Sequence, residues 1–332
     1  MSKIEVRKFE IANESIWDRF VELSINGTIF HERKFINYHP KDKFKDNSLE
    51  FYEKGNLKAV FPAALIEKEG KVILKSHPGT SYGGLVFAKS IGVKSALEYI
   101  AALESYCKAN GITQIEFRLA EKIFQLINAD EIDFALLHSG FFREAEELST
   151  CYNIEKLKSL NPDEIIARFD MKARNKYKQS LKYKLSTKFI DSKKELAEFQ
   201  EIVASNLEKH SAKPVHSADD IIYLCKQYPT KCKVMGIYSG SDLIAGFFII
   251  NVSQKGWHIF YSSLDYKFAE MRPINFGFLE LVIWLKSEET NFLNYGISTE
   301  AGGKIINHSL FDFKESFGGE GILRTYWMKE LT

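Results

Sequence analysis

The chain has 332 residues, of which 45% are hydrophobic and 27% charged, a composition typical of a folded protein with about two domains. Its 45 Lys and Arg residues balance 44 Asp and Glu residues and leave a formal net charge of +1, so binding to nucleic acid or acidic membrane would need a local basic patch. The 26 Phe, 15 Tyr and 4 Trp residues supply more apolar surface than a disordered chain carries, which excludes that class.

The sequence lacks the signals of a secreted, membrane-spanning or metal-binding protein. The first ten residues contain no apolar segment of a secretory signal, and the longest strongly apolar stretch, residues 243–252, is about half of the ~20 residues that a membrane helix needs. The four cysteines form no CxxC pair, and the eight histidines form no HExxH or HxxxH motif. We therefore expect a cytoplasmic protein with reduced thiols and no metal site.

The first half of the chain predicts a strand, a helix, a three-stranded meander, a glycine-rich loop, a long helix and a return strand. Alternating apolar residues indicate the strands, and apolar residues three and four positions apart indicate the helices. In chain order, these elements are expected at residues 4–9, 14–23 with Asn13 as N-cap, 48–53, 57–67, 71–76, 78–84, 93–109 and 112–117.

The second half repeats this order of elements. Helices are expected at 193–209 and 217–227, strands at 233–238, 243–252 and 257–263, a helix at 273–286 and a strand at 292–295. The hairpin glycines lie 15 residues apart in the first half (Gly55, Gly70) and 16 apart in the second (Gly240, Gly256). This repetition predicts an α+β fold built from a duplicated unit, rather than one large sheet.

A meander followed by a helix and a return strand resembles the core of GNAT acyltransferases. In that core the fourth and fifth strands splay apart, and their free backbone groups hold an acyl donor. The resemblance places the splay after Ser76 in the first half and after Ser263 in the second. The alternative is a pair of α+β domains with another purpose.

Three segments make the resemblance more specific: SHPGTSYGGLV (76–86), MKARNKYKQSLKYK (171–184) and NYGISTEAGGKIINHSLFDFKESFGG (294–319). Their spacing resembles the FemABX-like branch of the GNAT superfamily, in which two GNAT-like domains are fused. A basic helix opens the second domain of that branch and an FK..FG segment closes it, as Phe313-Lys314 and Phe317-Gly318 do here. The resemblance implies tandem GNAT-like domains with a mixed α/β sheet, at 1–157 and 158–332.

The same resemblance implies transfer of an acyl or aminoacyl group to an amine of a cell-envelope glycan or peptidoglycan precursor. The implied acceptor is a nucleotide sugar, a lipid-linked molecule or an amino sugar, with peripheral contact to the inner membrane surface. No tightly bound cofactor is implied, and acyl-CoA or aminoacyl-tRNA is the co-substrate. Two alternatives stay open: an acetyl-CoA-dependent N-acetyltransferase of an amino sugar in polysaccharide biosynthesis, and a non-catalytic binding protein on a degenerate fold.

The sequence leaves the donor open. Residues 270–277 contain an Arg and a Gly, but they lack the Q/RxxGxG/A spacing with which GNAT enzymes hold pyrophosphate at a helix N-terminus. Residues 191–233 show no sustained heptad, so the coiled-coil arm of many aminoacyl-tRNA-dependent relatives is not expected.

Lys314 is the first catalytic candidate, together with the preceding Phe313. The resemblance implies that this lysine stabilises the negative charge that builds on the carbonyl oxygen when an amine attacks, an interaction that is stronger in the transition state than in the ground state. The alternative is a surface lysine paired with Glu315 or Glu320.

Residues 171–190 contain seven basic residues and no acidic one. Apolar residues at three- and four-residue steps, from Ile166 to Leu185, predict one amphipathic helix with a buried stripe. Arg174 and Lys178 lie one turn apart and are candidates to bind a phosphate group of the acceptor or of tRNA. The alternative is a solvated helix face.

The remaining candidates lie in two polar segments. In the loop at 76–84, His77 is a candidate general base or sugar contact, and Ser81, Tyr82 and Gly83 are candidate substrate contacts; a structural histidine is the alternative. In the second half, a Tyr at the end of a splayed strand is expected to protonate the leaving group, and Glu300 is expected to accept the amine's proton. Arg272 and Asn275, at the N-terminus of the following helix, are candidate contacts of the donor or the acceptor. The alternative for the strand-end residues is a polar loop; these candidates are Tyr261, Tyr295, Ser298, Thr299 and Glu300.

Overall fold

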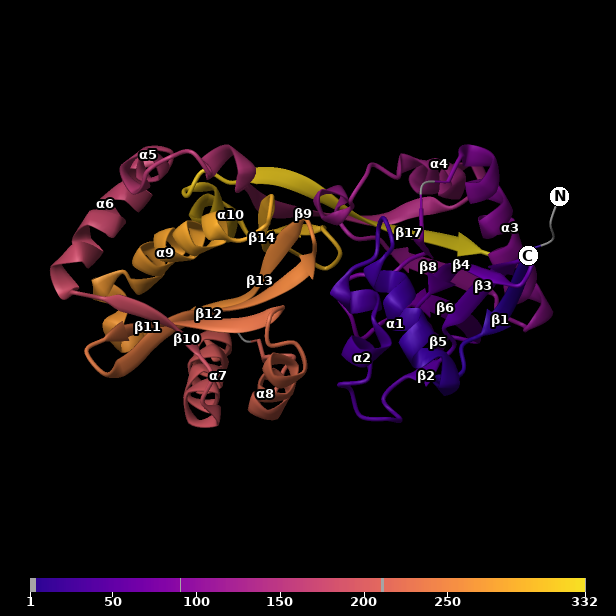
Figure 1. The fold of residues 1–332 in the computed structure, drawn as a ribbon, viewed down its shortest axis with the longest axis horizontal. Helices are drawn as coiled ribbons and strands as arrows, with labels where there is room; N and C mark the ends of the chain where they lie inside the picture. Colours follow the sequence, from indigo (N-terminus) through magenta and orange to yellow (C-terminus); the bar gives the residue numbers. More distant parts are fainter. Residues whose placement is uncertain (1–3, 90, 210–211, 332) are drawn as a thin grey trace. The chain divides into compact units, whose positions relative to one another are not determined.

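The computed structural model describes residues 4–89, 91–209 and 212–331, which form two units (Figure 1). The first unit contains Met1–Glu147, Ala301–Ile305 and Leu323–Thr332, and the second contains Leu148–Glu300 and Ile306–Ile322. Within the described ranges, no helix is both long and apolar enough to cross a membrane.

The first unit has the predicted order of strands and helices. Its helix α3 (Val93–Ala109) has the bounds expected from the sequence, and it connects the parallel strands β6 (Lys71–Ser76) and β8 (Gln114–Arg118). The other elements are β1 (Glu5–Lys8), α1 (Glu14–Glu22), α2 (Arg33–Ile36), β2 (Lys45–Asp46), β3 (Leu49–Glu53), β4 (Asn56–Phe61), β5 (Ala63–Lys68), β6 (Lys71–Ser76), β7 (Val86–Phe87), β8 (Gln114–Arg118) and α4 (Asp130–His138).

Pro62 divides what the sequence predicts as one strand. Proline has no backbone N–H and cannot donate to a strand ladder, so the segment expected at 57–67 becomes β4 and β5. β4 belongs to a four-stranded sheet with β1, β3 and β7, whereas β5 pairs with β6 and β2. The carbonyl of Pro62 accepts a hydrogen bond from the N–H of His77 at 3.0 Å. The prediction of one continuous strand is therefore wrong.

The second unit repeats the meander, crossover helix and parallel return strand. Strands β11 (Cys232–Ser239) and β13 (Gly256–Leu264) pair antiparallel with β12 (Asp242–Ser253). After helix α9 (Pro273–Ser287), strand β14 (Phe292–Ile297) returns parallel to β13. The elements are α5 (Pro162–Ala167), α6 (Met171–Ser180), β10 (Ser186–Ile190), α7 (Lys193–Glu208), α8 (Ala218–Gln227), β11 (Cys232–Ser239), β12 (Asp242–Ser253), β13 (Gly256–Leu264), α9 (Pro273–Ser287), β14 (Phe292–Ile297) and α10 (His308–Glu315). A two-stranded sheet joins β15 (Thr299–Glu300) to β16 (Ile305–Ile306).

Two long strands, β9 (Phe142–Asn153) and β17 (Glu320–Glu330), contain residues of both units. β9 pairs with β14, and β17 pairs with β8. The hydrogen-bonded order β10-β11-β12-β13-β14-β9-β17-β8-β6-β5-β2 runs through both of these strands. The expectation of separate sheets rather than one large sheet is therefore wrong, although the repeated order of elements is observed in each unit.

Helix α9 is the centre of the second unit's core. Phe278, Leu281 and Leu285 are fully buried in it and pack with the inner faces of the meander strands. Gly277 allows this close approach, because a Cβ atom there would lie 2.3 Å from Cδ1 of Ile237. A helix that is apolar on several faces is expected where a crossover is covered on more than one side.

The basic segment does not form the single helix that its pattern predicts. The basic residues lie on α6, on β10 and between them, and the apolar stripe starts in α5; Asp170 caps the start of α6 by accepting a hydrogen bond from the N–H of Ala173 at 2.6 Å. Phe169 and Ala173 are buried as predicted, but Leu181, expected on the buried stripe, is 55% exposed. The apolar stripe therefore covers fewer residues than the periodicity indicates.

The start of α1 also differs from the prediction. Asn13 precedes the helix as expected, but its side chain accepts no capping hydrogen bond. Its amide instead donates to Oε2 of Glu50 at 3.0 Å on β3. Asn13 thus connects the helix to the sheet, and its predicted role as a side-chain cap is wrong.

Candidate functional site

Strands β13 and β14 separate early in the second unit. Their parallel pairing covers Gly256–His258 and Phe292–Asn294 and then ends, although β13 continues to Leu264 along β12. Gly296 has a φ of +78°, and its N–H donates to the side chain of Asn294 at 2.5 Å rather than to a neighbouring strand. This local bend directs β14 away from β13, so the splay begins five residues before the predicted Ser263.

A tyrosine and a serine connect the two strands beyond their last pair. The hydroxyl of Tyr295 lies 3.1 Å from Oγ of Ser262, and the ring of Tyr295 stacks on Phe278 with centroids 5.5 Å apart. Burial raises the pKa of Tyr295, which keeps the hydroxyl protonated at neutral pH. Tyr295 therefore holds a neutral donor group at the base of the splay.

Lys314, on α10, reaches the separated end of β14. Its side chain is only 5% exposed, and Nζ donates to the carbonyl of Ile297 at 2.6 Å and to that of Gly296 at 3.0 Å. Burial lowers the pKa of Lys314 to about 7, since a charge is costly in a poorly solvated position. Both the ammonium and the neutral amine are thus accessible near neutral pH.

Aromatic side chains and a glycine fix the helix that carries Lys314. Phe313 packs edge-on against Phe317 with centroids 5.3 Å apart, and the hydroxyl of Tyr152 donates to the carbonyl of Lys314. Gly318 ends the segment with a φ of +86°, where a Cβ atom would come within 3.1 Å of the carbonyl of Arg168. The Phe-Lys..Phe-Gly pattern therefore has a geometric basis: aromatic anchors, a buried cation and a left-handed turn.

Two unsatisfied hydroxyl groups follow the carbonyls that Lys314 contacts. Within the described part of the chain, Oγ of Ser298 and Oγ1 of Thr299 are buried without a hydrogen-bond partner. Buried polar atoms are normally paired, so such groups suit a bound ligand. Glu300, the next residue, is exposed on β15, and no hydrogen bond joins it to Lys314 among the residues that the structure describes.

Tyr261 lies apart from this cluster. Its hydroxyl accepts hydrogen bonds from the N–H groups of Val215 at 3.1 Å and His216 at 3.2 Å. Since successive strand residues point to opposite faces, Tyr261 faces away from Ser262 and Tyr295. Burial raises its pKa to about 12, and its contacts stabilise the segment before α8.

The candidate phosphate and helix-terminus residues are distributed over α6 and the start of α9. Arg272 has a φ of +55°, and its Nε donates to Oε1 of Gln179 on α6 at 3.2 Å. Asn275 is buried in the first turn of α9. On α6, Arg174 is half-buried and Lys178 is exposed. The structure thus joins Arg272 to the basic helix but shows no shared contact between Arg174 and Lys178.

In the first unit, the glycine-rich loop fills the corresponding opening. The parallel pairing of β6 and β8 ends at Lys75 and Glu116. Beyond that point, the N–H of Gly83 donates to the carbonyl of Arg118 at 2.7 Å, and the N–H of Arg118 donates to Oγ of Ser76 at 2.8 Å. The loop therefore pairs with the return strand where the second unit is splayed.

The candidate residues of this loop are mostly directed inward. Tyr82 is 1% exposed, and the carbonyl of Ser81 accepts a hydrogen bond from Arg324 at 2.6 Å. His77 is also buried, and its Nδ1 accepts a hydrogen bond from the N–H of Gly79 at 3.2 Å. Burial lowers the pKa of His77 to about 4, so the ring is neutral at physiological pH.

Among the described residues, neither a metal-binding cluster nor a reactive thiol offers a second candidate for the catalytic site. Among the residues described, no group of three or more His, Cys, Asp or Glu side chains is arranged to hold a metal ion. All four cysteines are free thiols. Burial raises the pKa of Cys107 and of Cys225 to about 12 each, which leaves these two thiols protonated and poorly nucleophilic.

Sequence reasoning missed Ser262, Tyr152 and the two backbone carbonyls that Lys314 contacts. Ser262 could have been identified from the sequence, because alternation along the predicted strand places it on the face opposite Tyr261. Tyr152 lies 162 residues before Lys314, and no local pattern indicates that pair. The carbonyls of Gly296 and Ile297 depend on the bend of β14, for which Gly296 is the only local signal.

No protein-family model and no curated protein matches the sequence. Solved structures do match: FemX superposes with a TM-score of 0.70 at 11% identity, covering 98% of this chain and 97% of FemX. The C-terminal domain of a putative lysylphosphatidylglycerol synthetase from Agrobacterium fabrum gives 0.58 at 11% identity, covering 96% and 91%. A tandem GNAT protein from the clavulanic acid biosynthesis pathway gives 0.53 at 9% identity, covering 99% of both chains.

The chain has the tandem GNAT-like fold of FemX. At these identities the likeness establishes the fold, and it confirms the predicted α+β class and the predicted resemblance to FemABX-like proteins at that level. The FemX-like fold accounts for the crossover helix and return strand in each unit. In this chain, the segment from Phe313 to Gly318 lies beside the end of β14, where Lys314 donates to the carbonyl of Ile297.

Proposed function

We propose that this protein transfers an acyl or aminoacyl group from an activated donor to an amine of a cell-envelope glycan or peptidoglycan precursor. The observation that carries the proposal is the buried Lys314, whose Nζ contacts two carbonyls at the separated end of β14. A FemX-like fold and a lysylphosphatidylglycerol synthetase domain among the similar structures support a transferase of this kind.

The proposed reaction takes place beside Lys314 in the second unit. The amine attacks the carbonyl carbon, a C–N bond forms, and the C–S bond of a thioester or the C–O bond of an aminoacyl ester breaks. The amine's proton ends on the departing thiolate or alkoxide. Charged Lys314 stabilises the oxyanion, an effect that is large where the local environment excludes water.

Neighbouring groups take supporting roles in this proposal. Ser298 and Thr299 offer unsatisfied hydroxyls to the substrate, and Phe313 holds the lysine helix. Glu300 is proposed to accept the amine's proton, with Tyr295 as the donor to the leaving group. Neutral Lys314 is a second candidate for the proton, because its pKa of about 7 makes that form available.

Substrate positioning is assigned to the polar residues outside this cluster. Arg174 and Lys178 on α6, with Arg272 and Asn275 at the start of α9, are proposed to bind phosphate groups of the acceptor or the donor. Tyr261 is proposed to act through the segment before α8. His77, Ser81, Tyr82 and Gly83, in the loop of the first unit, are proposed to have a structural role within that unit, because their side chains or backbone groups are buried or hydrogen-bonded there.

An acetyl-CoA-dependent N-acetyltransferase of an amino sugar is the second candidate. It is favoured by the 15-residue helix α9, which begins with Pro273 after the segment that connects it to the splayed strand β13. A helix N-terminus at this place is suited to a pyrophosphate group. Against it stand the missing Q/RxxGxG/A spacing and the hydrogen bond that engages Arg272 with Gln179.

A ligand-induced stabilisation screen separates these candidates. Acetyl-CoA, a long-chain acyl-CoA and alanyl-tRNA would each be added to the protein, with free CoA and uncharged tRNA as controls. A ligand at 100 times its Kd stabilises the native state by about 2.7 kcal/mol, a rise of a few degrees in Tm. The best donor is then tested for transfer to amino-sugar and peptide amines. If no donor stabilises the protein and none is consumed, the proposed transferase function is wrong.

A further inference from the structure

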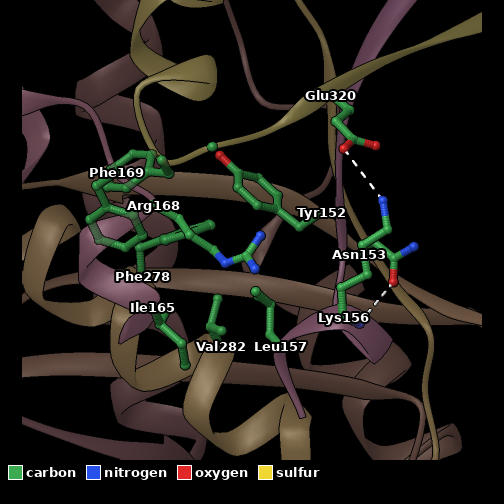
Figure 2. Close-up of a pocket in the computed structure, with 12 residues that line it drawn as sticks. Tyr152, Asn153, Lys156, Leu157, Ile165, Arg168, Phe169, Phe278, Val282 and Glu320 are labelled. Carbon is green, nitrogen blue, oxygen red and sulfur yellow. Dashed lines mark hydrogen bonds and ion pairs between the residues drawn. The ribbon is translucent and has the colours of Figure 1, made fainter. Parts of the chain in front are cut away.

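The second unit contains a pocket of about 280 Å³ that the proposed reaction does not use (Figure 2). Strand β9, helices α5 and α9 and the segment after α10 contribute its walls. Its floor is apolar and formed by side chains that are at most 8% exposed: Tyr152, Leu157, Ile165, Phe169, Phe278 and Val282.

The floor is suited to an aliphatic group. A dry cavity of about 150 Å³ lined by apolar side chains is large enough for benzene, so 280 Å³ has room for a chain of roughly eight carbons. Three of the floor residues are aromatic, and the floor offers the Tyr152 hydroxyl as its main polar group. That hydroxyl already donates to the carbonyl of Lys314. A tail without polar atoms therefore leaves no buried group unsatisfied.

The mouth of the pocket carries positive charge. Arg168 is an exposed residue, and Figure 2 shows its guanidinium between the side chains of Tyr152 and Leu157. Lys156, also at the mouth, forms an ion pair with Glu320 at 3.7 Å. Within the described ranges, the guanidinium of Arg168 has neither an ion pair nor a hydrogen bond. One cation is thus neutralised and the other is available to an anion.

The pocket is distinct from the candidate catalytic cluster but contacts it. None of its lining residues is Lys314, Tyr295 or Ser262. Two of them nevertheless bind the backbone of the catalytic helix: Tyr152 donates to the carbonyl of Lys314, and so does the N–H of Phe317, at 3.3 Å. An occupant of the pocket therefore contacts residues that position Lys314.

We propose that this pocket binds a small amphipathic anion, with an aliphatic chain of about eight carbons on the apolar floor and a carboxylate or phosphate against Arg168. Charge complementarity selects the head group and the buried aromatic floor selects the tail. The site is independent of the acyl-group chemistry proposed above, because it depends on Arg168 and the floor residues and not on Lys314.

Calorimetric titration of the full chain with octanoate and with octyl phosphate tests the proposal, and octanol and octylammonium serve as uncharged and cationic probes. We expect the anions to bind, and Arg168→Gln to weaken their binding by at least about tenfold, the effect of losing one charge-assisted hydrogen bond. Lys176→Gln, which removes an exposed positive charge from α6, is the matched control and should leave affinity unchanged.

The two head groups distinguish the natural source. Tighter octanoate binding assigns the site to a fatty acid, and tighter octyl phosphate binding assigns it to a phosphorylated lipid fragment. A second variant, Val282→Phe, fills the apolar floor of the pocket and should abolish binding of both anions. Arg168→Gln changes an exposed residue and should leave the fold intact. Equal affinity of wild type and Arg168→Gln, equal binding of octanol and octanoate, or no measurable heat with either anion would overturn the proposal, whatever the outcome for transferase activity.

Discussion

The hydroxyl of Tyr295 and Oγ of Ser262 lie 3.1 Å apart, and this contact joins β14 to β13 beyond the point at which the two strands stop pairing. A splayed pair loses the ladder hydrogen bonds that normally hold neighbouring strands together. The side-chain contact replaces part of that connection without closing the backbone. It therefore fixes the opening beside which Lys314 lies.

Removing this contact should destabilise the second unit. We expect Ser262→Ala and Tyr295→Phe each to lower the free energy of unfolding by about 1 kcal/mol, or more if a hydroxyl is left buried and unpaired. The double variant should be less destabilised than the sum of the two, because both changes remove the same interaction. Urea unfolding of the four proteins measures this coupling, and strict additivity would show that the contact contributes nothing.

Lys314 should be required for turnover but not for folding. We expect Lys314→Ala to lose more than ~100-fold in kcat with the donor that the stabilisation screen selects, because the oxyanion loses its cation. Lys314→Arg should not restore activity, since the larger guanidinium must fit a position in which the lysine side chain is only 5% exposed. Lys267→Ala, at an exposed lysine of the same unit, is the control. Near-wild-type turnover of Lys314→Ala would remove the catalytic assignment.

The depressed pKa of Lys314 predicts a pH dependence of stability. Its pKa is about 7 in the folded protein and about 10.5 when unfolded, so between these values the unfolded chain binds more protons. Stability should therefore rise from pH 7 to pH 10, by a few kcal/mol in the limit, and this rise should disappear in Lys314→Met. Chemical denaturation of both proteins at pH 7, 8.5 and 10 measures it; parallel curves would contradict the lowered pKa.

The buried His77 predicts acid sensitivity of the first unit. Its pKa is lowered from 6.5 to about 4 on folding, so the unfolded chain binds more protons between those values. Stability should be lost as the pH falls from 7 to 5, by about 2 kcal/mol for this residue. His77→Gln should show a smaller loss than His138→Gln, which changes an exposed histidine. Equal pH profiles for the two variants would show that His77 is not the cause.

Two glycines of the first unit with similar φ angles should differ strongly on substitution. A Cβ atom at Gly303, where φ is +87°, would lie 1.7 Å from the carbonyl oxygen of Glu146, whereas a Cβ atom at Gly55, where φ is +77°, meets nothing within 4 Å. Gly55→Ala should cost about 1–2 kcal/mol from backbone strain alone. Gly303→Ala should cost distinctly more, because the backbone must move. Thermal unfolding compares them, and equal Tm values would refute the close approach.

Local patterns were sufficient for most of the fold. Helix α3 and the hairpins at Gly55, Gly70 and Gly240 follow from periodicity and turn chemistry, which act over a few residues. The break at Pro62 was also readable, since proline interrupts a strand ladder. The β9 and β17 strands were missed because their neighbours, such as β14 and β8, lie far away in the sequence.

The candidate site was predictable only in part. The pattern around Lys314 identified the lysine, but its partners at Gly296 and Ile297 follow from a bend in β14 that a single sequence does not specify. At Leu181 the pattern was misleading: periodicity predicts that its side chain is buried, but α6 ends at Ser180 and the side chain is exposed. Side chains that meet across long loops depend on tertiary packing, which propensity does not encode.

Strand β17 affects when the first unit can finish folding during synthesis. Trp327 on this strand belongs to the core of the first unit, together with Phe117 and Phe141, and β17 pairs along β8. A ribosome synthesises β8, which ends at Arg118, about two hundred residues before β17, which begins at Glu320. The edge of β8 that pairs with β17 therefore stays unpaired until β17 has been synthesised. The core of the first unit is complete only when Trp327 of β17 packs into it.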